Sequence, residues 1–482
     1  MRKLPFSIVA LGACVATTLG ACSSDDTLVH SPPPDAGTDV TVSPDAGQDA
    51  GQDAGPSTLS SIKHVVVIFL ENHSFDNLYG SYPGAEGLAA VGTKGIQVDP
   101  TNTAYAKLPQ NDPKVPDGEI DNGPFDLTKY VTNDQVTTKD VTHRFYHEQM
   151  QINAGKMDSF VAYNDESKGL AMGVYPTADL PFVKFLNTIP SQVTVCDHFF
   201  HAAFGGSFLN HIWLIAGATP HFEGAPDFMK AQLDTNGRMT KDGILTPDGY
   251  AVNTIFSVNL PHPTIDETKT RYLPNQKQSE IPTIGDQLDA ASVDWAWYSG
   301  GWNAAIAGNA DPLFQYHHQP FIYFENYADG TAAKTKHLKD EADFIAAAKA
   351  GTLPAVSFVK PVGVDNEHPK YANMVRGQNH TIDLIKDVMN SSTWNDTAII
   401  VTYDENGGFW DHVAPPTTDK WGPGSRIPAI IISPFAKGGV DSTAYDTTAI
   451  LKLIEKRWGL PDLNARVGGQ ADLSAHAFKF GN

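Results

Sequence analysis

From residue 61 onward, the chain alternates short apolar runs with polar, glycine-rich stretches. Continuous apolar runs are typical of strands that are buried on both faces of a sheet. Six such runs cover residues 65–70, 193–196, 295–298, 356–359, 398–402 and 429–432. Between them, apolar residues recur at helical spacing, most clearly in residues 380–389 and 448–458. Strands that alternate with helices predict an α/β fold with a largely parallel sheet covered by helices on both faces.

Two long stretches interrupt this pattern, at about residues 85–140 and 220–280. Both are rich in Pro, Gly, Asp and Thr, which favour turns and irregular loops. We expect them to be insertions over one end of the sheet, within a single folded domain that spans residues 61–482.

The first 21 residues have the pattern of an export signal. Arg2 and Lys3 form a charged start, residues 6–19 are mostly apolar, and the sequence LGAC follows at residues 19–22. The apolar part is too short to be a permanent transmembrane helix. Small residues before Cys22 resemble the bacterial lipobox, in which the signal is cut before the cysteine and lipid is attached to its thiol. The alternative is an ordinary cleaved signal with an incidental cysteine, but the polar run that follows favours the lipobox.

Residues 22–60 are predicted to be a disordered tether. They contain three consecutive prolines at 32–34, repeated Asp-Ala-Gly units and no Lys or Arg. So few apolar side chains cannot offset the conformational entropy lost on folding. Together with Cys22, this segment predicts an exported protein that is either anchored by lipid to a membrane of the bacterial cell envelope or secreted.

The overall composition changes the picture in two ways. There are 34 Lys and Arg against 55 Asp and Glu, which gives a net charge of −21. This balance argues against a nucleic-acid partner, because affinity for a polyanion comes mainly from basic side chains on phosphates. Two of the three cysteines, Cys14 and Cys22, precede the folded domain, so Cys196 has no partner for a disulfide.

Oxygen-bearing side chains follow two of the predicted strands. The sequence ENHSFD occupies residues 71–76, and DENGGFWDHV occupies residues 404–413. In an open α/β sheet, ligands bind beyond the carboxyl ends of the strands. Glu71, Asn72, Asp404 and Glu405 are hard oxygen donors that suit one divalent cation, and two neighbouring parallel strands can direct them at it. The alternative is that they are solvated acids in loops.

A third motif, FGGSFLNH at residues 204–211, precedes a strongly apolar helix-like run. The two glycines allow a tight turn and a close ligand approach, and Ser207 then stands at the start of a helix. A helix N-terminus favours an anion and the ionisation of a nucleophile placed there. The other interpretation is that Ser207 only caps the helix.

The chain has 17 histidines, several of them beside chemically suggestive neighbours. His143 precedes a helix-like run, His317 and His318 are adjacent, and His368 lies in the sequence DNEHP. Neutral imidazole can ligate a metal, whereas protonated imidazole can stabilise phosphate charge or protonate a leaving oxygen. A single histidine in a loop is more often structural, so the adjacent pair is the stronger signal.

Taken together, these segments resemble the bacterial phosphoesterase family of acid phosphatases and non-haemolytic-type phospholipases C. The matching pieces occur in the order of the family and span about residues 61–435. They comprise residues 71–76, His143 with residues 155–158, residues 206–211, residues 317–321, residues 367–369 and residues 404–413 with Pro415 and Pro416. The resemblance implies an alkaline-phosphatase-like α/β fold and metal-dependent hydrolysis of phosphate esters through a phosphoserine.

By matching position, the resemblance implies a role for each candidate residue. Ser207 is the nucleophile, one divalent metal ion is the cofactor, and the substrate is a phosphate monoester or a phospholipid. The implied metal ligands are Glu71, Asn72, Asp404 and Glu405, and the implied groups around the phosphate are His143, His317, His318 and His368. Either His318 or His368 is expected to protonate the leaving group. An inactive, lipid-anchored binding lipoprotein is the alternative from a different functional class.

The sequence also departs from the family pattern. His73 replaces a common Arg, and Leu209 and His211 replace a frequent Pro and Arg after the nucleophile. These departures concern contacts with the substrate more than the chemistry.

Overall fold

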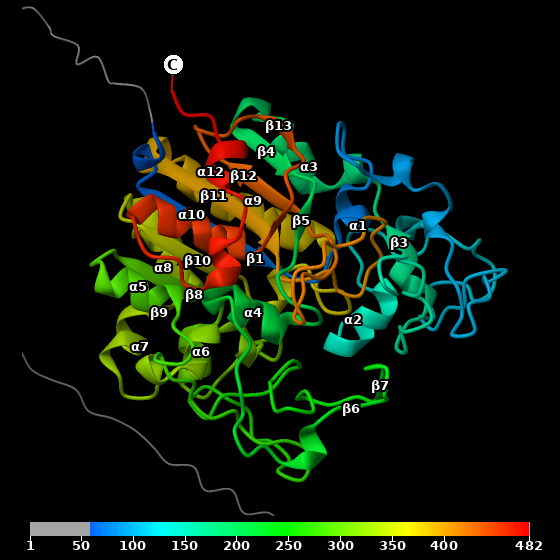
Figure 1. Cartoon of the computed structure of the whole chain (residues 1–482). Coiled ribbons are helices and arrows are strands. Elements are labelled where there is room, and N and C mark those ends of the chain that lie inside the picture. The colour runs from blue at the N-terminus through cyan, green and yellow to red at the C-terminus, as the bar shows by residue number, and fades with distance from the viewer. Residues whose placement is uncertain (1–57, 482) are drawn as a thin grey trace, which may run out of the picture. The chain divides into compact units, whose positions relative to one another are not determined.

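The structure is a computed structural model that describes residues 58–481, and the predicted signal segment and most of the predicted tether lie outside the described residues. β1 (His64–Leu70) lies in the interior of an eight-stranded sheet, with the strand order β13-β4-β12-β11-β1-β10-β8-β9 (Figure 1). The other strands of this sheet are β4 (Val193–Cys196), β8 (Trp295–Ser299), β9 (Leu338–Asp340), β10 (Val356–Lys360), β11 (Thr397–Tyr403), β12 (Ala429–Ile432) and β13 (Gly439–Asp441). All six predicted strands are confirmed.

The sheet is mostly parallel, as predicted. β1 pairs in parallel with β10 and with β11, and the parallel pairing continues through β8 to β9. β12 is the exception, because it runs antiparallel to both β11 and β4. A continuous apolar run marks a buried strand but not its direction, so the sequence could not reveal this reversal.

Helices pack on the sheet and complete the α/β architecture. They are α1 (Phe75–Tyr79), α2 (Phe145–Ile152), α3 (Pro181–Leu186), α4 (Ser207–Ala216), α5 (Ile284–Ala290), α6 (Trp302–Ile306), α7 (Ala332–His337), α8 (Glu341–Ala350), α9 (Met374–Met389), α10 (Thr448–Trp458), α11 (Ala465–Gly468) and α12 (Leu473–His476). Helix α10 has the bounds predicted for it, whereas α9 begins six residues before the predicted start. Of residues 374–379, only Met374 and Val375 have apolar side chains, and Asn373 caps the helix by accepting a hydrogen bond from the backbone N–H of Arg376.

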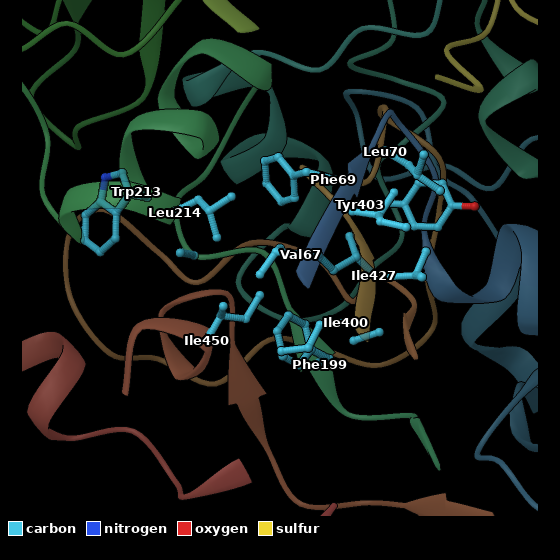
Figure 2. Packing of buried hydrophobic residues seen from close by; sticks show 14 of the residues in the cluster. Val67, Phe69, Leu70, Phe199, Trp213, Leu214, Ile400, Tyr403, Ile427 and Ile450 are labelled. Carbon is cyan, nitrogen blue, oxygen red and sulfur yellow. The ribbon is translucent and has the colours of Figure 1, made fainter. Parts of the chain in front are cut away.

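The core lies between the sheet and these helices. Residues 65–70 of β1 are completely buried, as expected of a strand covered on both faces. Figure 2 shows Leu214 of α4 and Ile450 of α10 in the same apolar cluster as Val67 of β1 and Ile400 of β11. The helix that begins at Ser207 is therefore held firmly against the central strands.

The two predicted insertions contain little regular structure. In the first, β2 (Phe125–Asp126) pairs with β3 (Gly173–Val174), and in the second, β6 (Gln232–Leu233) pairs with β7 (Met239–Lys241). The remaining two-stranded sheet pairs β5 (Phe199–Phe200) with β14 (Tyr445–Asp446). Across residues 58–481, no helix has both the length and the apolar character needed to cross a membrane.

Candidate active site

The strand register brings two of the sequence motifs together at the carboxyl end of the sheet. Leu70 of β1 is paired with Tyr403 of β11, so Glu71 and Asp404, the next residue of each strand, emerge side by side. The backbone N–H of Asn72 donates a hydrogen bond to Asp404 Oδ1 over 3.2 Å. Asp404 is followed directly by Glu405, whose N–H bonds the same oxygen over 2.8 Å. We call Glu71, Asn72, Asp404 and Glu405 the carboxylate cluster.

A close approach of two backbones explains one glycine of the second motif. Asn72 has a φ of 67°, in the left-handed region that is unusual for a residue other than glycine. A Cβ atom on Gly407 would lie 2.2 Å from the carbonyl oxygen of Asn72, which no side chain can accommodate. Gly407 therefore permits the contact that sets Asn72 beside Asp404.

The carboxylate cluster is buried but leaves several oxygen atoms without a hydrogen-bond donor. All four side chains are at most 1% exposed. Buried oxygens of this kind are normally satisfied, so each one needs an explanation. The unpartnered atoms are Oε2 of Glu71, Oδ1 of Asn72, Oδ2 of Asp404 and Oε1 of Glu405. Carboxylate and amide oxygens without donors fit a hard divalent cation.

Lys360, at the end of β10, partly neutralises this cluster. Its Nζ lies 2.6 Å from Glu71 Oε1 and is itself completely buried. Burial by itself raises the pKa of Glu71, but the charges of His318 and Lys360 outweigh it and hold that pKa well below its usual range. Three carboxylates and one ammonium leave two negative charges, which is the charge that one divalent ion balances.

The pKa values of Asp404 and Glu405 show that their negative charges are unfavourable when no cation is bound. Burial and the charge of Glu71 raise the pKa of Asp404 to about 7, although Lys360 opposes the shift. Burial and the neighbouring Asp404 raise the pKa of Glu405 well above its usual range. Without a cation, the cluster therefore favours protonated carboxyl groups over carboxylates at neutral pH.

Ser207 meets this cluster from α4. It is the first residue of the helix, while Gly206 occupies the capping position and makes no side-chain capping bond. The Ser207 hydroxyl instead lies close enough to the Asp404 carboxylate to lower the pKa of that group. Gly205, with a φ of 88°, passes so close to the backbone of Phe145 that an added Cβ would lie 2.5 Å from its nitrogen. The interpretation of Ser207 as a helix cap is wrong.

A cavity of about 230 Å³ connects Ser207 to the surface. Glu71 and three of the four predicted histidines, His143, His317 and His368, line it with Ser207. The cavity thus contains the nucleophile candidate, one member of the carboxylate cluster and a set of imidazoles, which are the groups that phosphoryl transfer requires.

His318 lies elsewhere, behind Glu71. Its Nε2 is 2.6 Å from Glu71 Oε1, and its ring stacks on that of His211 at 4.8 Å between centroids. Glu71, His211 and His318 have potential ligand atoms within 4.8 Å of one another, so two nitrogens can join the oxygens of the carboxylate cluster around an ion. Burial lowers the pKa of His318 to about 4 and that of His211 well below its usual range, which keeps both imidazoles neutral, as metal ligands must be.

Three residues of this region were missed by the sequence analysis as site residues. Lys360 could have been noticed in the sequence, because it is a single charged residue at the end of the apolar run 356–359. His211 lies four residues after Ser207 on the same face of α4, a spacing that could have identified it. Asp140, which also lines the cavity, lies in an irregular insertion and gave no signal.

The fold and the site define an α/β protein with acids, a serine and histidines at the carboxyl end of its sheet. Residues 62–461 match the model of the Phosphoesterase family, so the chain belongs to that family and is a phosphoric ester hydrolase. The family resemblance inferred from the motifs is thereby confirmed.

The chain is similar to bacterial phospholipases C. Phospholipase C A of Mycobacterium tuberculosis is 26% identical over 88% of this chain and 78% of its own. Non-hemolytic phospholipase C of Pseudomonas aeruginosa is 25% identical over 88% of this chain and 58% of its own. A solved protein of the alkaline phosphatase superfamily from Vibrio parahaemolyticus is 12% identical and covers 71% of this chain and 73% of its own, with a TM-score of 0.32.

Proposed function

We propose that this enzyme is a metal-dependent hydrolase that acts through a phosphoserine on Ser207, of the phospholipase C or acid phosphatase type. The observation that carries the proposal is the position of Ser207. Its hydroxyl lies beside the Asp404 carboxylate, in a cluster with unpartnered oxygens, at the first residue of α4, and Ser207 lines the cavity. A nucleophile needs an adjacent proton acceptor and an electropositive setting, and this position provides both.

The carboxylate cluster is proposed to hold one divalent cation through Glu71, Asn72, Asp404 and Glu405. Their unpartnered oxygens and the two uncompensated negative charges support this assignment. When bound, the ion would act as a Lewis acid that favours the ionised hydroxyl and stabilises charge on a phosphoryl group.

The protein's own groups account for the transfer steps. Ser207 Oγ attacks phosphorus while the hydroxyl proton passes to the carboxylate of Asp404, and the bond from phosphorus to the ester oxygen breaks. A water molecule then attacks phosphorus and the bond to Ser207 Oγ breaks, which releases phosphate from a monoester substrate or the phosphorylated headgroup from a phospholipid. Ser207 Oγ regains the proton from Asp404, and one proton of the water passes to the histidine that protonated the leaving oxygen. The imidazoles along the cavity orient the phosphoryl oxygens and stabilise their charge.

His368 is the better candidate for protonating the leaving oxygen. It lines the cavity, whereas His318 is turned toward Glu71. The Nδ1 of His368 is bonded to the carbonyl of Pro369 at 2.6 Å, which leaves Nε2 as the atom that takes up and delivers a proton.

The substrate is proposed to be a phosphate monoester or the phosphodiester of a phospholipid. The names of the relatives favour the phospholipid. We also propose that the mature chain is exported and carries lipid on Cys22, which would hold the catalytic domain near a membrane. Release of phosphate from p-nitrophenyl phosphate and of headgroup from phosphatidylcholine vesicles, measured side by side, would separate the two substrate classes.

Replacing the nucleophile tests the mechanism. Ser207→Ala is expected to lower turnover by several orders of magnitude and abolish the phosphoenzyme, with little change in melting temperature. Ser207→Thr keeps the hydroxyl and should retain partial activity. The measurement is steady-state turnover together with acid-quench trapping of labelled phosphoenzyme.

Thr331→Ala is the matched control, because Thr331 is a true helix cap that accepts a hydrogen bond from the backbone of Lys334. Its loss should cost about 0.5–2 kcal/mol of stability and leave turnover normal. A Ser207→Ala enzyme with the turnover of this control would refute the mechanism.

A further inference from the structure

Asp140, His143 and His368 converge at the cavity from separate parts of the chain. Asp140 and His143 precede α2, and His368 lies in the loop between β10 and α9. Each offers a potential ligand atom, and these three atoms all lie within 4.8 Å of one another. All three residues line the same cavity as Ser207. Asp140 and His143 are partly exposed, which gives an ion a route of entry.

Backbone carbonyls fix the same tautomer in the two imidazoles, and His143 Nε2 also lies 3.3 Å from Asn72 Nδ2. His143 Nδ1 lies 2.5 Å from the carbonyl oxygen of Val141, and His368 Nδ1 lies 2.6 Å from that of Pro369. A carbonyl only accepts, so in each neutral ring Nδ1 carries the proton and Nε2 carries the lone pair. Donation of the second ring N–H to a backbone carbonyl is the usual arrangement of a histidine that ligates a metal.

This group differs in chemistry from the carboxylate cluster. The cluster presents four oxygen-bearing side chains, which suit a hard ion, whereas this group presents two imidazoles and one carboxylate. Two histidines and one carboxylate are a common three-residue set for zinc, and imidazole also suits other late transition metals. Three protein ligands leave at least one coordination position open for water or another small ligand.

We propose that Asp140, His143 and His368 form a second cation site, selective for Zn²⁺ or a similar transition-metal ion. An ion there engages the Nε2 atoms of His143 and His368 and so withdraws both imidazoles from the phosphate. The site does not depend on the chemistry of Ser207. It is linked to the proposed function by that shared pair of histidines and by the 3.3 Å contact between His143 Nε2 and Asn72 Nδ2.

The experiment counts bound zinc. Protein stripped of metal with a chelator is titrated with Zn²⁺ by calorimetry and checked by elemental analysis after gel filtration. The wild type is expected to bind two equivalents, one in each site. Asp140→Asn keeps the bond that Asp140 Oδ1 accepts from the N–H of Val141, so it should fold normally. It should lose one equivalent, or bind it at least about tenfold more weakly.

Two further variants separate this inference from the proposed function. Asp165→Asn is the matched control, since Asp165 also faces a histidine, with 3.6 Å between its Oδ2 and His147 Nε2, and should retain both equivalents. Ser207→Ala should retain both as well, whether or not it turns over substrate. The inference would be overturned if Asp140→Asn bound as much zinc as the wild type, with the same affinity. It would also be overturned if His368→Gln still bound two equivalents of zinc.

Discussion

Two buried clusters of acids follow the same pair of strands, β1 and β11. Only one of them contains carboxylate oxygens that accept no hydrogen bond. The carboxylate cluster comes directly after β1 and β11, and a second cluster of Asp76, Asp411, His412 and Arg426 begins a few residues further along the same loops. In this second group, which we call the arginine cluster, Arg426 lies 3.1 Å from Asp76 Oδ1 and 3.0 Å from Asp411 Oδ1. His412 Nδ1 completes it at 2.6 Å from Asp76 Oδ2.

The difference shows what makes a group of ligand-type residues a site. Asp76, Asp411 and His412 are as close together as metal ligands, within 4.8 Å. Both of their carboxylates nevertheless contact Arg426, and all four carboxylate oxygens accept hydrogen bonds, so no oxygen is left for an ion. The carboxylate cluster has one lysine, Lys360, for three acids, and several of its oxygens lack donors. We therefore expect changes in the arginine cluster to affect folding, and changes in the carboxylate cluster to affect metal binding and turnover.

The largest effect is expected in the carboxylate cluster. Asp404→Asn should lower turnover by several orders of magnitude, because it removes both a proposed ligand and the proposed proton acceptor beside Ser207. Elemental analysis of the purified variant should show the loss of the ion that the wild type carries. Wild-type turnover by chelator-treated, metal-free enzyme would contradict the assignment.

The same variant should change how stability depends on pH. In metal-free protein, burial and Glu71 raise the pKa of Asp404 to about 7, from about 3.9 in the unfolded chain. The folded state then binds more protons than the unfolded state between about pH 4 and pH 7, so the free energy of unfolding falls as pH rises through that window. Metal-free Asp404→Asn should show a shallower fall in urea unfolding. Burial also raises the pKa of Glu367 to about 7. Part of the fall in the free energy of unfolding with pH therefore remains in both proteins.

Much of the fold was predictable because each central strand is buried along its whole length. The six apolar runs are continuous for this reason, and they identified every strand from which a candidate ligand follows. The direction of β12 and the true start of α9 were not predictable. Strand direction leaves no apolar pattern, and after Met374 and Val375 no apolar side chain follows until Ile382. For the site, adjacency of β1 and β11 was enough to bring Glu71 and Asp404 together. Lys360 and Asp140 reach the site from other segments through tertiary contacts, which a single sequence does not record.

A smaller effect is expected in the arginine cluster. Arg426→Met leaves two buried carboxylates without their cation and should destabilise the protein by about 3–5 kcal/mol. Metal content and turnover of the folded fraction should stay close to the wild type. Urea unfolding and elemental analysis measure the two effects separately. Arg376→Met is the control, because Arg376 pairs with Asp365 at the surface and should cost less than about 1 kcal/mol.

The smallest effect is expected at Cys196, which borders the arginine cluster. Cys196 is completely buried in β4, as the sequence predicted, and the carbonyl of the next residue, Asp197, accepts a hydrogen bond from Arg426 over 2.9 Å. Burial and the charges of Asp441 and Asp197 raise the pKa of its thiol well above the usual range, so little reactive thiolate forms. Cys196→Ala should cost on the order of 1 kcal/mol and leave turnover unchanged. In the native wild type, a thiol reagent should label Cys196 only as fast as the protein unfolds. Arg426→Met should accelerate this labelling. Asp404→Asn should not accelerate it, provided that the variant folds normally. Rapid labelling of the native wild type would show that the arginine cluster is more open than its hydrogen bonds indicate.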